Sequence, residues 1–252
     1  MDAHRINAIA TPAPSVFPRR GFLGVLTLDT RFPRLPGDIG NPASFGFPAL
    51  TRVVRGARPD QAVQSAAAQR AADLFAPFCA AMRDLESMGA SAITTSCGFL
   101  VLLQDRLQAA AKVPVVTSSL LFLPELLASR PRVGVLTISA QHLGEEFLAA
   151  AGVPEARMRD VIVEGVAPDG EFARTFLGNR SVLDVVQARR DVVDAARRLC
   201  AREPSLTDIV LECTNMPPFA GAVVQATGLR CRSLLQSERL AASCGGTRST
   251  VA

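Results

Sequence analysis

Short apolar runs alternate with longer segments of helical pattern along most of this chain. The runs are rich in Val, Ile, Leu and Thr, which is typical of buried strands. We expect strands at residues 22–28, 47–55, 90–95, 113–117, 134–138, 161–166, 208–212 and 229–235. We expect helices at residues 60–88, 99–111, 118–129, 141–151 and 185–199. This alternation predicts an α/β fold with parallel sheets and right-handed crossovers.

The chain repeats its pattern near residue 130. The letters GVLTL at Gly24–Leu28 return as GVLTI at Gly134–Ile138. Each copy is followed by a cysteine at the end of a strand, Cys97 after 73 positions and Cys213 after 79. Because the order and the spacing both match, the pattern indicates an internal duplication with two pseudo-symmetric halves.

The expected domain organisation follows from this duplication. Residues 21–130 form a first α/β half and residues 131–235 a second, with the active site in the cleft between them. Residues 1–20 contain three prolines and are expected to form a disordered arm. Residues 236–252 read as a polar tail without a long helix. A return of the chain to the first half near residues 214–235 is left open.

Local signals refine the helices. Asp60 is expected to cap helix 60–88, and Pro77 to kink it or to divide it in two. Ser139 is expected to cap helix 141–151. Ser181 and Asp184 resemble a capping box before helix 185–199.

Residues 31–42 are dense in Pro, Gly, Asp and Asn, so they form a loop with one or more turns. The loop is long for a connection between a strand and a helix, and long ordered loops are often binding loops or lids. A surface excursion explains it equally well. Arg31 and Arg34 could pair with a second carboxylate of a ligand, but solvated surface arginines are the favoured interpretation.

Composition narrows the classes of function. The net charge is +4, with no basic cluster interleaved with aromatic residues, and no apolar run reaches the ~18–20 residues that span a bilayer. We therefore expect neither nucleic acid nor a membrane as a partner. The six cysteines form no C-x-x-C pair, and neither histidine lies near one in sequence, so we expect free thiols, no metal and a cytoplasmic setting.

The basic residues are almost all arginine, which accounts for 26 of the 27. The single lysine, Lys112, lies at the end of a helical segment. A Schiff-base or pyridoxal phosphate enzyme needs a lysine in its site. The composition thus argues against a Schiff-base or pyridoxal phosphate mechanism.

Cys97 and Cys213 carry the chemistry that we expect. Each follows a strand in a polar turn before a helix, where backbone N–H groups favour a thiolate. Across a cleft, one thiolate takes a proton from a carbon beside a carboxylate or carbonyl, and the other thiol returns one on the opposite face. Because free cysteine titrates near about 8.5, the surroundings must lower the pKa of one of the pair. Cys79 and Cys200 lie on apolar helix faces and are expected to be structural.

The substrate is expected at the carboxyl ends of the strands, where parallel sheets bind ligands. Backbone N–H groups and small polar side chains there could hold a substrate carboxylate and stabilise an enediolate-like intermediate. The candidate substrate-binding residues are Asp29, Thr30, Thr95, Ser96, Gly98, Thr117, Ser118, Thr137, Thr214 and Asn215.

The motifs around the two cysteines resemble those of the aspartate/glutamate racemase superfamily. Leu211–Pro217 (LECTNMP) is similar to its Gly-Cys-Thr-x-x-Pro segment, and Thr95–Cys97 matches its first-cysteine segment. Asp29-Thr30 lies where amino-acid racemases of the family carry an Asp-Ser pair near the substrate. The resemblance covers residues 21–235. It implies a cofactor-independent enzyme with one cysteine on each face of the substrate, commonly a homodimer.

Three positions depart from the pattern of that superfamily. Gly98 stands where amino-acid racemases usually have Asn, and Glu212 replaces the usual Gly. Asn215 stands where glutamate racemases have His. The departures leave the two-thiol scheme intact and the substrate, a small carboxylate, unassigned.

The first prediction is therefore a cofactor-independent racemase or epimerase that transfers protons between Cys97 and Cys213. The alternative on the same site is a decarboxylase or a cis–trans isomerase of a small dicarboxylate. Decarboxylation needs only one proton donor, and isomerisation can use a thiol as a nucleophile. A non-catalytic ligand-binding member of the fold is the third possibility.

Overall fold

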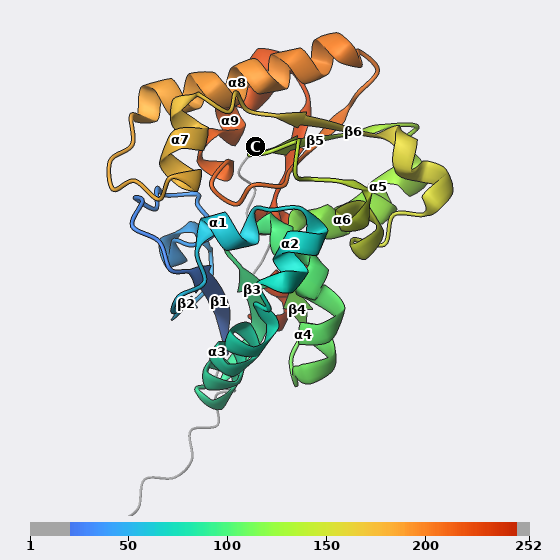
Figure 1. Ribbon diagram of the computed structural model, residues 1–252. Coiled ribbons are helices and arrows are strands. Elements are labelled where there is room, and N and C mark those ends of the chain that lie inside the picture. Colours follow the sequence, from blue (N-terminus) through green and yellow to red (C-terminus); the bar gives the residue numbers. More distant parts are fainter. Residues whose placement is uncertain (1–20, 246–252) are drawn as a thin grey trace, which may run out of the picture.

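The computed structural model describes residues 21–245 and contains two four-stranded sheets in two lobes (Figure 1). The strand order is β2-β1-β3-β4 in the first sheet and β6-β5-β7-β8 in the second. All neighbouring strands are parallel. The predicted α/β fold is thus confirmed. The arm expected at residues 1–20 and the end of the expected tail, residues 246–252, lie outside the described residues.

The elements of the first sheet and the helices around it come first in the chain. The strands are β1 (Phe22–Leu28), β2 (Ala49–Val54), β3 (Ala90–Thr95) and β4 (Val115–Val116). The helices are α1 (Pro59–Ala62), α2 (Ala66–Ala71), α3 (Phe75–Ser87), α4 (Gln104–Ala110) and α5 (Leu123–Ser129).

The second sheet has β5 (Val133–Thr137), β6 (Val161–Gly165), β7 (Asp208–Leu211) and β8 (Arg230–Arg232). Its helices are α6 (Glu145–Ala150), α7 (Glu171–Leu177), α8 (Val185–Arg202) and α9 (Ala220–Thr227). The last described helix is α10 (Glu238–Ser243). Figure 1 shows α8 along the outer side of the second lobe.

The repeated GVLT letters form the first strand of each sheet, β1 and β5, and both strands are buried in the lobe interiors. A Cβ atom on Gly24 would lie within 3.0 Å of Leu85 in α3, and one on Gly134 within 3.0 Å of Leu199 in α8. The glycine therefore recurs because it lets the same helix of each lobe pack closely on the sheet.

The chain leaves the third strand of each lobe in the same way. The N–H of Ser96, after β3, donates to the carbonyl oxygen of Leu26 in β1 at 2.9 Å. The N–H of Glu212, after β7, donates to the carbonyl oxygen of Leu136 in β5 at 2.8 Å. Ser96 and Glu212 are therefore equivalent positions, and so are the cysteines that follow them. Both turns lie where the strand order reverses, which is where such sheets bind ligands.

The first predicted helix is divided differently from the expectation. Residues 60–88 form three helices, and the breaks fall before α2 and before α3 rather than at Pro77. Pro77 lies in the first turn of α3, where its missing N–H costs no hydrogen bond. The residue before α1 is Arg58, so Asp60 is not its cap, whereas the Ser65 side chain caps α2.

Two caps in the second lobe also differ from the prediction. Helix α6 begins at Glu145 after Gly144, and Ser139 instead contacts the His142 ring at 3.0 Å. Asp184 alone caps α8, accepting from two backbone N–H groups. Asp191 of α8 is buried, and its carboxylate accepts from the Phe172 N–H at 2.9 Å.

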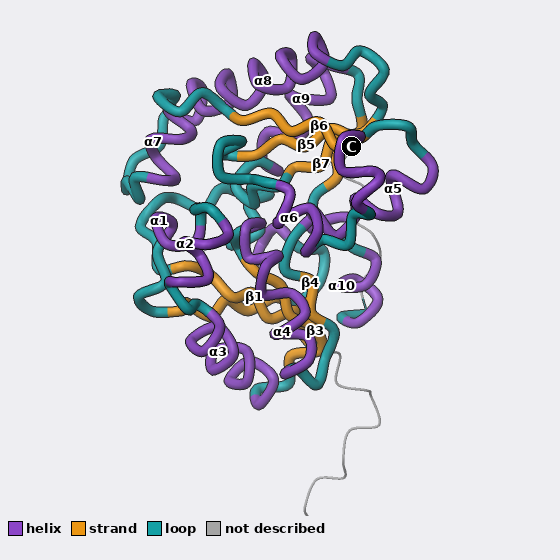
Figure 2. The backbone as a smooth tube through the Cα atoms, turned by 45° about the vertical axis from the view of Figure 1, so that its right-hand side comes forward, coloured by secondary structure: helices purple, strands orange, loops and turns teal. Residues whose placement is uncertain are grey.

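The segment predicted as a polar tail contributes to the core of the first lobe. Ser237 caps α10, and Leu240 and Cys244 are buried. They pack in one cluster with Leu23 of β1 and Ala92 of β3, and Figure 2 shows α10 beside β3 and β4. The polar composition hid this helix, because only one of its faces is apolar.

Within residues 21–245, no helix is both long and apolar enough to cross a membrane.

Candidate active site

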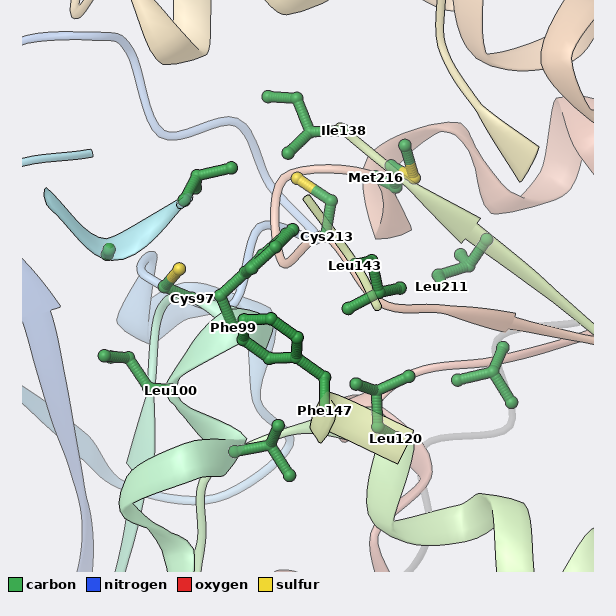
Figure 3. Packing of buried hydrophobic residues seen from close by; sticks show 14 of the residues in the cluster. Cys97, Phe99, Leu100, Leu120, Ile138, Leu143, Phe147, Leu211, Cys213 and Met216 are labelled. Carbon is green, nitrogen blue, oxygen red and sulfur yellow. The ribbon is translucent and has the colours of Figure 1, made fainter. Parts of the chain in front are cut away.

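Cys97 and Cys213 line one small pocket between the two lobes, with a cavity volume of about 30 Å³. Each reaches the pocket from the turn after the third strand of its own lobe. Figure 3 shows the two sulfur atoms on separate turns, with the Phe99 ring between them in this view. The other polar or glycine positions in the lining are Ser96, Gly98, Glu212, Thr214 and Asn215. The apolar lining consists of Leu28, Phe32, Pro59, Val63, Phe99, Ile138, Phe176 and Leu177.

Cys97 stands immediately before the 3-10 helix Gly98–Leu103, which begins the segment that was expected to be a single helix. Burial raises the pKa of its thiol to about 12, and the nearby charge of Glu212 acts in the same direction. Backbone hydrogen bonds from Phe99 and Leu100 lower the pKa, as does Arg34, but by less. The N–H groups thus act as the sequence predicts, yet burial outweighs them.

The pKa of the Cys213 thiol is set by the same opposing effects. Burial and then Glu212 raise the pKa of its thiol well above the ordinary value, and a backbone hydrogen bond from Asn215 only partly offsets them. Its sulfur lies 3.7 Å from Oδ1 of Asn215, which accepts the S–H. The expectation that the surroundings lower the pKa of one thiol is therefore wrong, because two buried thiols and a buried carboxyl share a small space of low dielectric.

Glu212 lines the pocket and has no exposed surface. Its Oε2 accepts a hydrogen bond from Oγ1 of Thr137 at 2.7 Å, while Oε1 has no hydrogen-bond partner among the described residues. Burial raises the pKa of this carboxyl to about 8, with Thr137 acting in the opposite direction. The carboxyl is therefore mostly neutral at pH 7.

Hydrogen bonds join the two lobes around the pocket. Oγ1 of Thr214 donates to the carbonyl oxygen of Ser96 at 2.6 Å, and Oγ of Ser119 donates to that of Leu211 at 2.7 Å. Both acceptors lie beside a cysteine turn or in the strand that leads into it. The bonds therefore fix how the two turns face each other.

The loop of residues 31–42 covers the boundary between the lobes. Asp38 is buried and accepts from Nδ2 of Asn215 at 2.7 Å, and the Ile39 N–H donates to the carbonyl oxygen of Thr214 at 3.2 Å. The Phe32 ring packs edge-on against Phe176 of α7, with the ring centroids 4.8 Å apart. The loop is thus a wall of the pocket rather than a surface excursion.

Arg34 is not the solvated arginine that was expected. Its side chain is 16% exposed and pairs with Asp38 at 3.0 Å. The same guanidinium donates to the hydroxyls of Thr30 and Ser96 and lies over the Phe32 ring. Arg34 therefore links the loop to the turn that carries Cys97. Arg31 is exposed, in line with the expectation.

Six of the predicted site residues line the pocket: Ser96, Cys97, Gly98, Cys213, Thr214 and Asn215. The others lie behind it or outside it. Thr95 and Thr117 are buried and donate to backbone or side-chain oxygens within the first lobe. Ser118 caps the 3-10 helix Ser119–Phe122, and Thr137 supports Glu212.

Asp29 lies outside the pocket. It is exposed, and its Oδ2 accepts from the Gly56 N–H at 3.1 Å. Its neighbour Thr30 accepts from Arg34. The resemblance implied that this pair lies near the substrate, but the structure turns Asp29 toward the loop after β2 and Thr30 toward Arg34.

Sequence reasoning missed the aromatic wall and the carboxyl of the pocket. Phe32 and Phe176 meet only when the lobes come together, so no local pattern marks them. Glu212 did leave a signal, because a carboxylate directly after the apolar letters IVL is unusual in a buried strand. Among residues 21–245, no group of three or more His, Cys, Asp or Glu is placed to hold a metal ion.

Comparison with curated proteins finds relatives of one kind. The chain is 30% identical over 227 residues to a dimethylsulfoniopropionate lyase of Durusdinium sp. clade D, covering 86% of this chain and 73% of the relative. It is 28% identical over 232 residues to dimethylsulfoniopropionate lyase 7 of Emiliania huxleyi, covering 82% of this chain. The chain spans 62% of that second relative. No protein-family model matches.

Comparison with solved structures finds the same fold at low identity. Allantoin racemase from Pseudomonas fluorescens has a TM-score of 0.55 at 18% identity, covering 91% of this chain and 94% of that one. Arylmalonate decarboxylase has a TM-score of 0.52 at 15% identity, covering 83% and 86%. A glutamate racemase from Bacillus anthracis has a TM-score of 0.51 at 13% identity, covering 85% and 77%.

Proposed function

We propose a lyase reaction for this chain, because it belongs to the family of the dimethylsulfoniopropionate lyase of Durusdinium sp. clade D, within the aspartate/glutamate/hydantoin racemase superfamily. The reaction begins when a cysteine thiolate removes a proton from the carbon beside a carboxylate. The observation that carries the proposal is that Cys97 and Cys213 line one pocket from two different lobes.

The lining supports a substrate with a sulfonium group over a free amino acid. An ammonium group in a buried site needs hydrogen-bond acceptors, whereas a dimethylsulfonium group has no N–H to satisfy. A cation without donors is well placed on aromatic faces. Three phenylalanines, Phe32, Phe99 and Phe176, line the pocket, and Asp29 lies outside it.

The reaction balances without a cofactor when dimethylsulfoniopropionate is the substrate. The thiolate takes a proton from the carbon beside the carboxylate, and the C–H electron pair forms the double bond of acrylate. The bond between the β-carbon and sulfur breaks, and its electron pair leaves with dimethyl sulfide. The proton on the cysteine returns to solvent.

A cationic substrate also lowers the high pKa of the two thiols. Burial raises the pKa of both thiols, so both are protonated at pH 7. A sulfonium charge in the same low-dielectric space stabilises a thiolate and so lowers the pKa of the thiol. Substrate binding thereby generates the base that the reaction needs.

Racemisation of a small carboxylate is the second candidate. Both cysteines occupy equivalent turns, and both receive backbone hydrogen bonds. A two-base racemase needs both thiols, one to remove the proton and one to return it. An elimination needs one base, so the two reactions differ in what each cysteine contributes.

The test is proton NMR of the purified chain with dimethylsulfoniopropionate in deuterated water, together with Cys97→Ala and Cys213→Ala. The proposal expects acrylate and dimethyl sulfide from the wild type. Removing the cysteine that acts as the base is expected to lower kcat by about 10²–10⁴-fold, the usual range for a general base. A panel of single enantiomers of amino acids and 2-substituted acids runs in parallel.

The outcomes separate the two candidates. Exchange of the α-proton with loss of optical activity, abolished in both variants, supports the racemase and rejects the lyase. Elimination at the wild-type rate in both variants rejects thiol chemistry altogether.

A further inference from the structure

The carboxyl group of Glu212 bridges the two cysteine turns. Its backbone immediately precedes Cys213. Its Oε1 lies against Gly98, the residue after Cys97, so closely that a Cβ atom there would come within 3.0 Å of it. In the equivalent position of the first lobe stands Ser96, a small neutral residue. The second lobe thus places an ionisable group where the first has a hydroxyl.

Asp208, a second buried carboxyl at the start of β7, shows how this fold stabilises a buried negative charge. Asp208 begins β7 with no exposed surface and forms ion pairs with Arg130, Arg230 and Arg232. Burial alone raises the pKa of Asp208, but hydrogen bonds from Arg230, Thr207 and Arg130 outweigh it and hold the pKa at about 2. Asp208 is therefore ionised.

Glu212, at the other end of that strand, has no such partner. Within the described part of the chain, the one hydrogen bond to its carboxyl comes from Thr137, and no ion pair reaches it. The groups that face it are the two thiols. Beyond them lie Asp38, which acts on Cys213, and Arg34, which is already paired with Asp38.

We propose that Glu212 enters the reaction as a neutral carboxylic acid whose Oε1–H donates a hydrogen bond to the substrate carboxylate between the two cysteines. The inference rests on the proposed function, because it needs a substrate whose carboxylate gains negative charge. An unpartnered oxygen in a buried pocket is stable when it carries a proton for which the ligand supplies the acceptor.

The chemistry requires a donor of this kind. When the α-proton leaves, the C–H electron pair spreads onto the carboxylate, which becomes an enediolate with a second negative charge. A donor already in place in a space that excludes water stabilises that charge more than water does. An ionised Glu212 would instead repel it. The hydrogen bond strengthens as the charge grows, so its contribution falls on kcat rather than on KM.

Glu212→Gln and Glu212→Leu test the inference, with Asp208→Asn as the control for a buried carboxyl on the same strand. Glutamine keeps a neutral donor, so kcat is expected within about tenfold of wild type. Leucine removes the donor, so kcat falls by about 10²–10³-fold with little change in KM. Alkylation of the thiols by iodoacetamide checks that the pocket of the leucine variant is intact.

The dependence of the rate on pH separates this role from a merely structural one, because a structural role would leave that dependence unchanged. In the wild type, kcat/KM is expected to fall as pH rises past about 8, because Glu212 of the free enzyme loses its proton. In Glu212→Gln the fall disappears, and the rate rises as the thiols ionise. In Asp208→Asn the fall remains.

Infrared difference spectra, wild type minus Glu212→Gln, provide a test without turnover. A band of a neutral carboxyl at pH 7 that shifts when propionate binds supports the inference. An ionised Glu212 at pH 7, or a neutral band that propionate does not move, overturns it. Wild-type kcat in Glu212→Leu, with elimination lost when the cysteine that acts as the base is removed, rejects the role of Glu212 and leaves the lyase standing. Full activity of both cysteine variants rejects a thiol as the base of the proposed elimination.

Discussion

Gly98 and Glu212 fit together as a pair. A Cβ atom on residue 98 would lie within 3.0 Å of both the Oε1 and the backbone oxygen of Glu212. These are two of the positions at which the chain departs from the superfamily pattern. The larger side chain on one turn is accommodated by the absence of a side chain on the other, so the two departures have one structural cause.

Gly98→Ala is expected to destabilise the fold by about 1–3 kcal/mol, the usual range for overpacking a buried site. The backbone oxygen of Glu212 cannot rotate away, so the turn after β3 must shift and the Cys97 thiol with it. Activity should therefore fall as well. Chemical denaturation and the acrylate assay measure both effects.

Gly221→Ala is the matched control, because a Cβ atom there meets nothing within 4 Å. It lies in α9, where alanine stabilises a helix relative to glycine by about 0.5–1 kcal/mol. Equal stability of Gly98→Ala and wild type would contradict the close fit of Gly98 and Glu212.

The stability of the wild type is expected to fall between pH 4.5 and about 8. Burial raises the pKa of Glu212 from the ordinary 4.5 to about 8, so within this window the folded state holds a proton that the unfolded chain releases. The stabilisation is complete below pH 4.5 and is lost as pH rises through about 8. The slope is about 1.4 kcal/mol per pH unit for one proton. Denaturation at several pH values measures this slope of the free energy of unfolding in the wild type, and the slope for Glu212→Gln should be smaller by that amount. Equal slopes for the two proteins would mean that Glu212 ionises in the folded state as it does in the unfolded chain.

Asp208→Asn is expected to destabilise the fold by about 1.5–3 kcal/mol at pH 7, because hydrogen bonds to a charged group are lost. The paired arginines are partly exposed, which keeps the loss below that of a fully buried ion pair. The folded pKa of about 2 lies below the ordinary 3.8, so the stabilisation is present above pH 3.8 and lost toward pH 2. The difference between variant and wild type should therefore shrink in acid, and a constant difference across pH would argue against an ionised Asp208.

Leu240→Ala is expected to cost about 2–5 kcal/mol, as for other large-to-small changes in a core. Leu240 is fully buried against the first sheet although it lies near the end of the described chain. Ala242→Ser, at an exposed position of the same helix, should leave the unfolding midpoint nearly unchanged. If Leu240→Ala is as stable as Ala242→Ser and the wild type, α10 does not belong to the core of the first lobe.

The sequence by itself determined the α/β class, the duplication and the two cysteine turns. Each of these depends on local pattern. Strand and helix periods are visible in short windows, and the glycine of the GVLT repeat marks the same packing requirement in both lobes. Strand-end positions follow from the same periods, so Cys97 and Cys213 could be assigned to turns after strands, and both line one pocket in the structure.

Only the tertiary structure decided which residues line the pocket and how they are protonated. Asp29 follows a strand end as Ser96 does, yet one faces away and the other lines the pocket, because the loop after β2 supplies a closer partner. Phe32 and Phe176 meet across the lobes, and α10 returns to the first sheet from the far end of the chain. The state of Glu212 depends on burial among residues distant in sequence, which no local window contains, and that burial makes its carboxyl neutral.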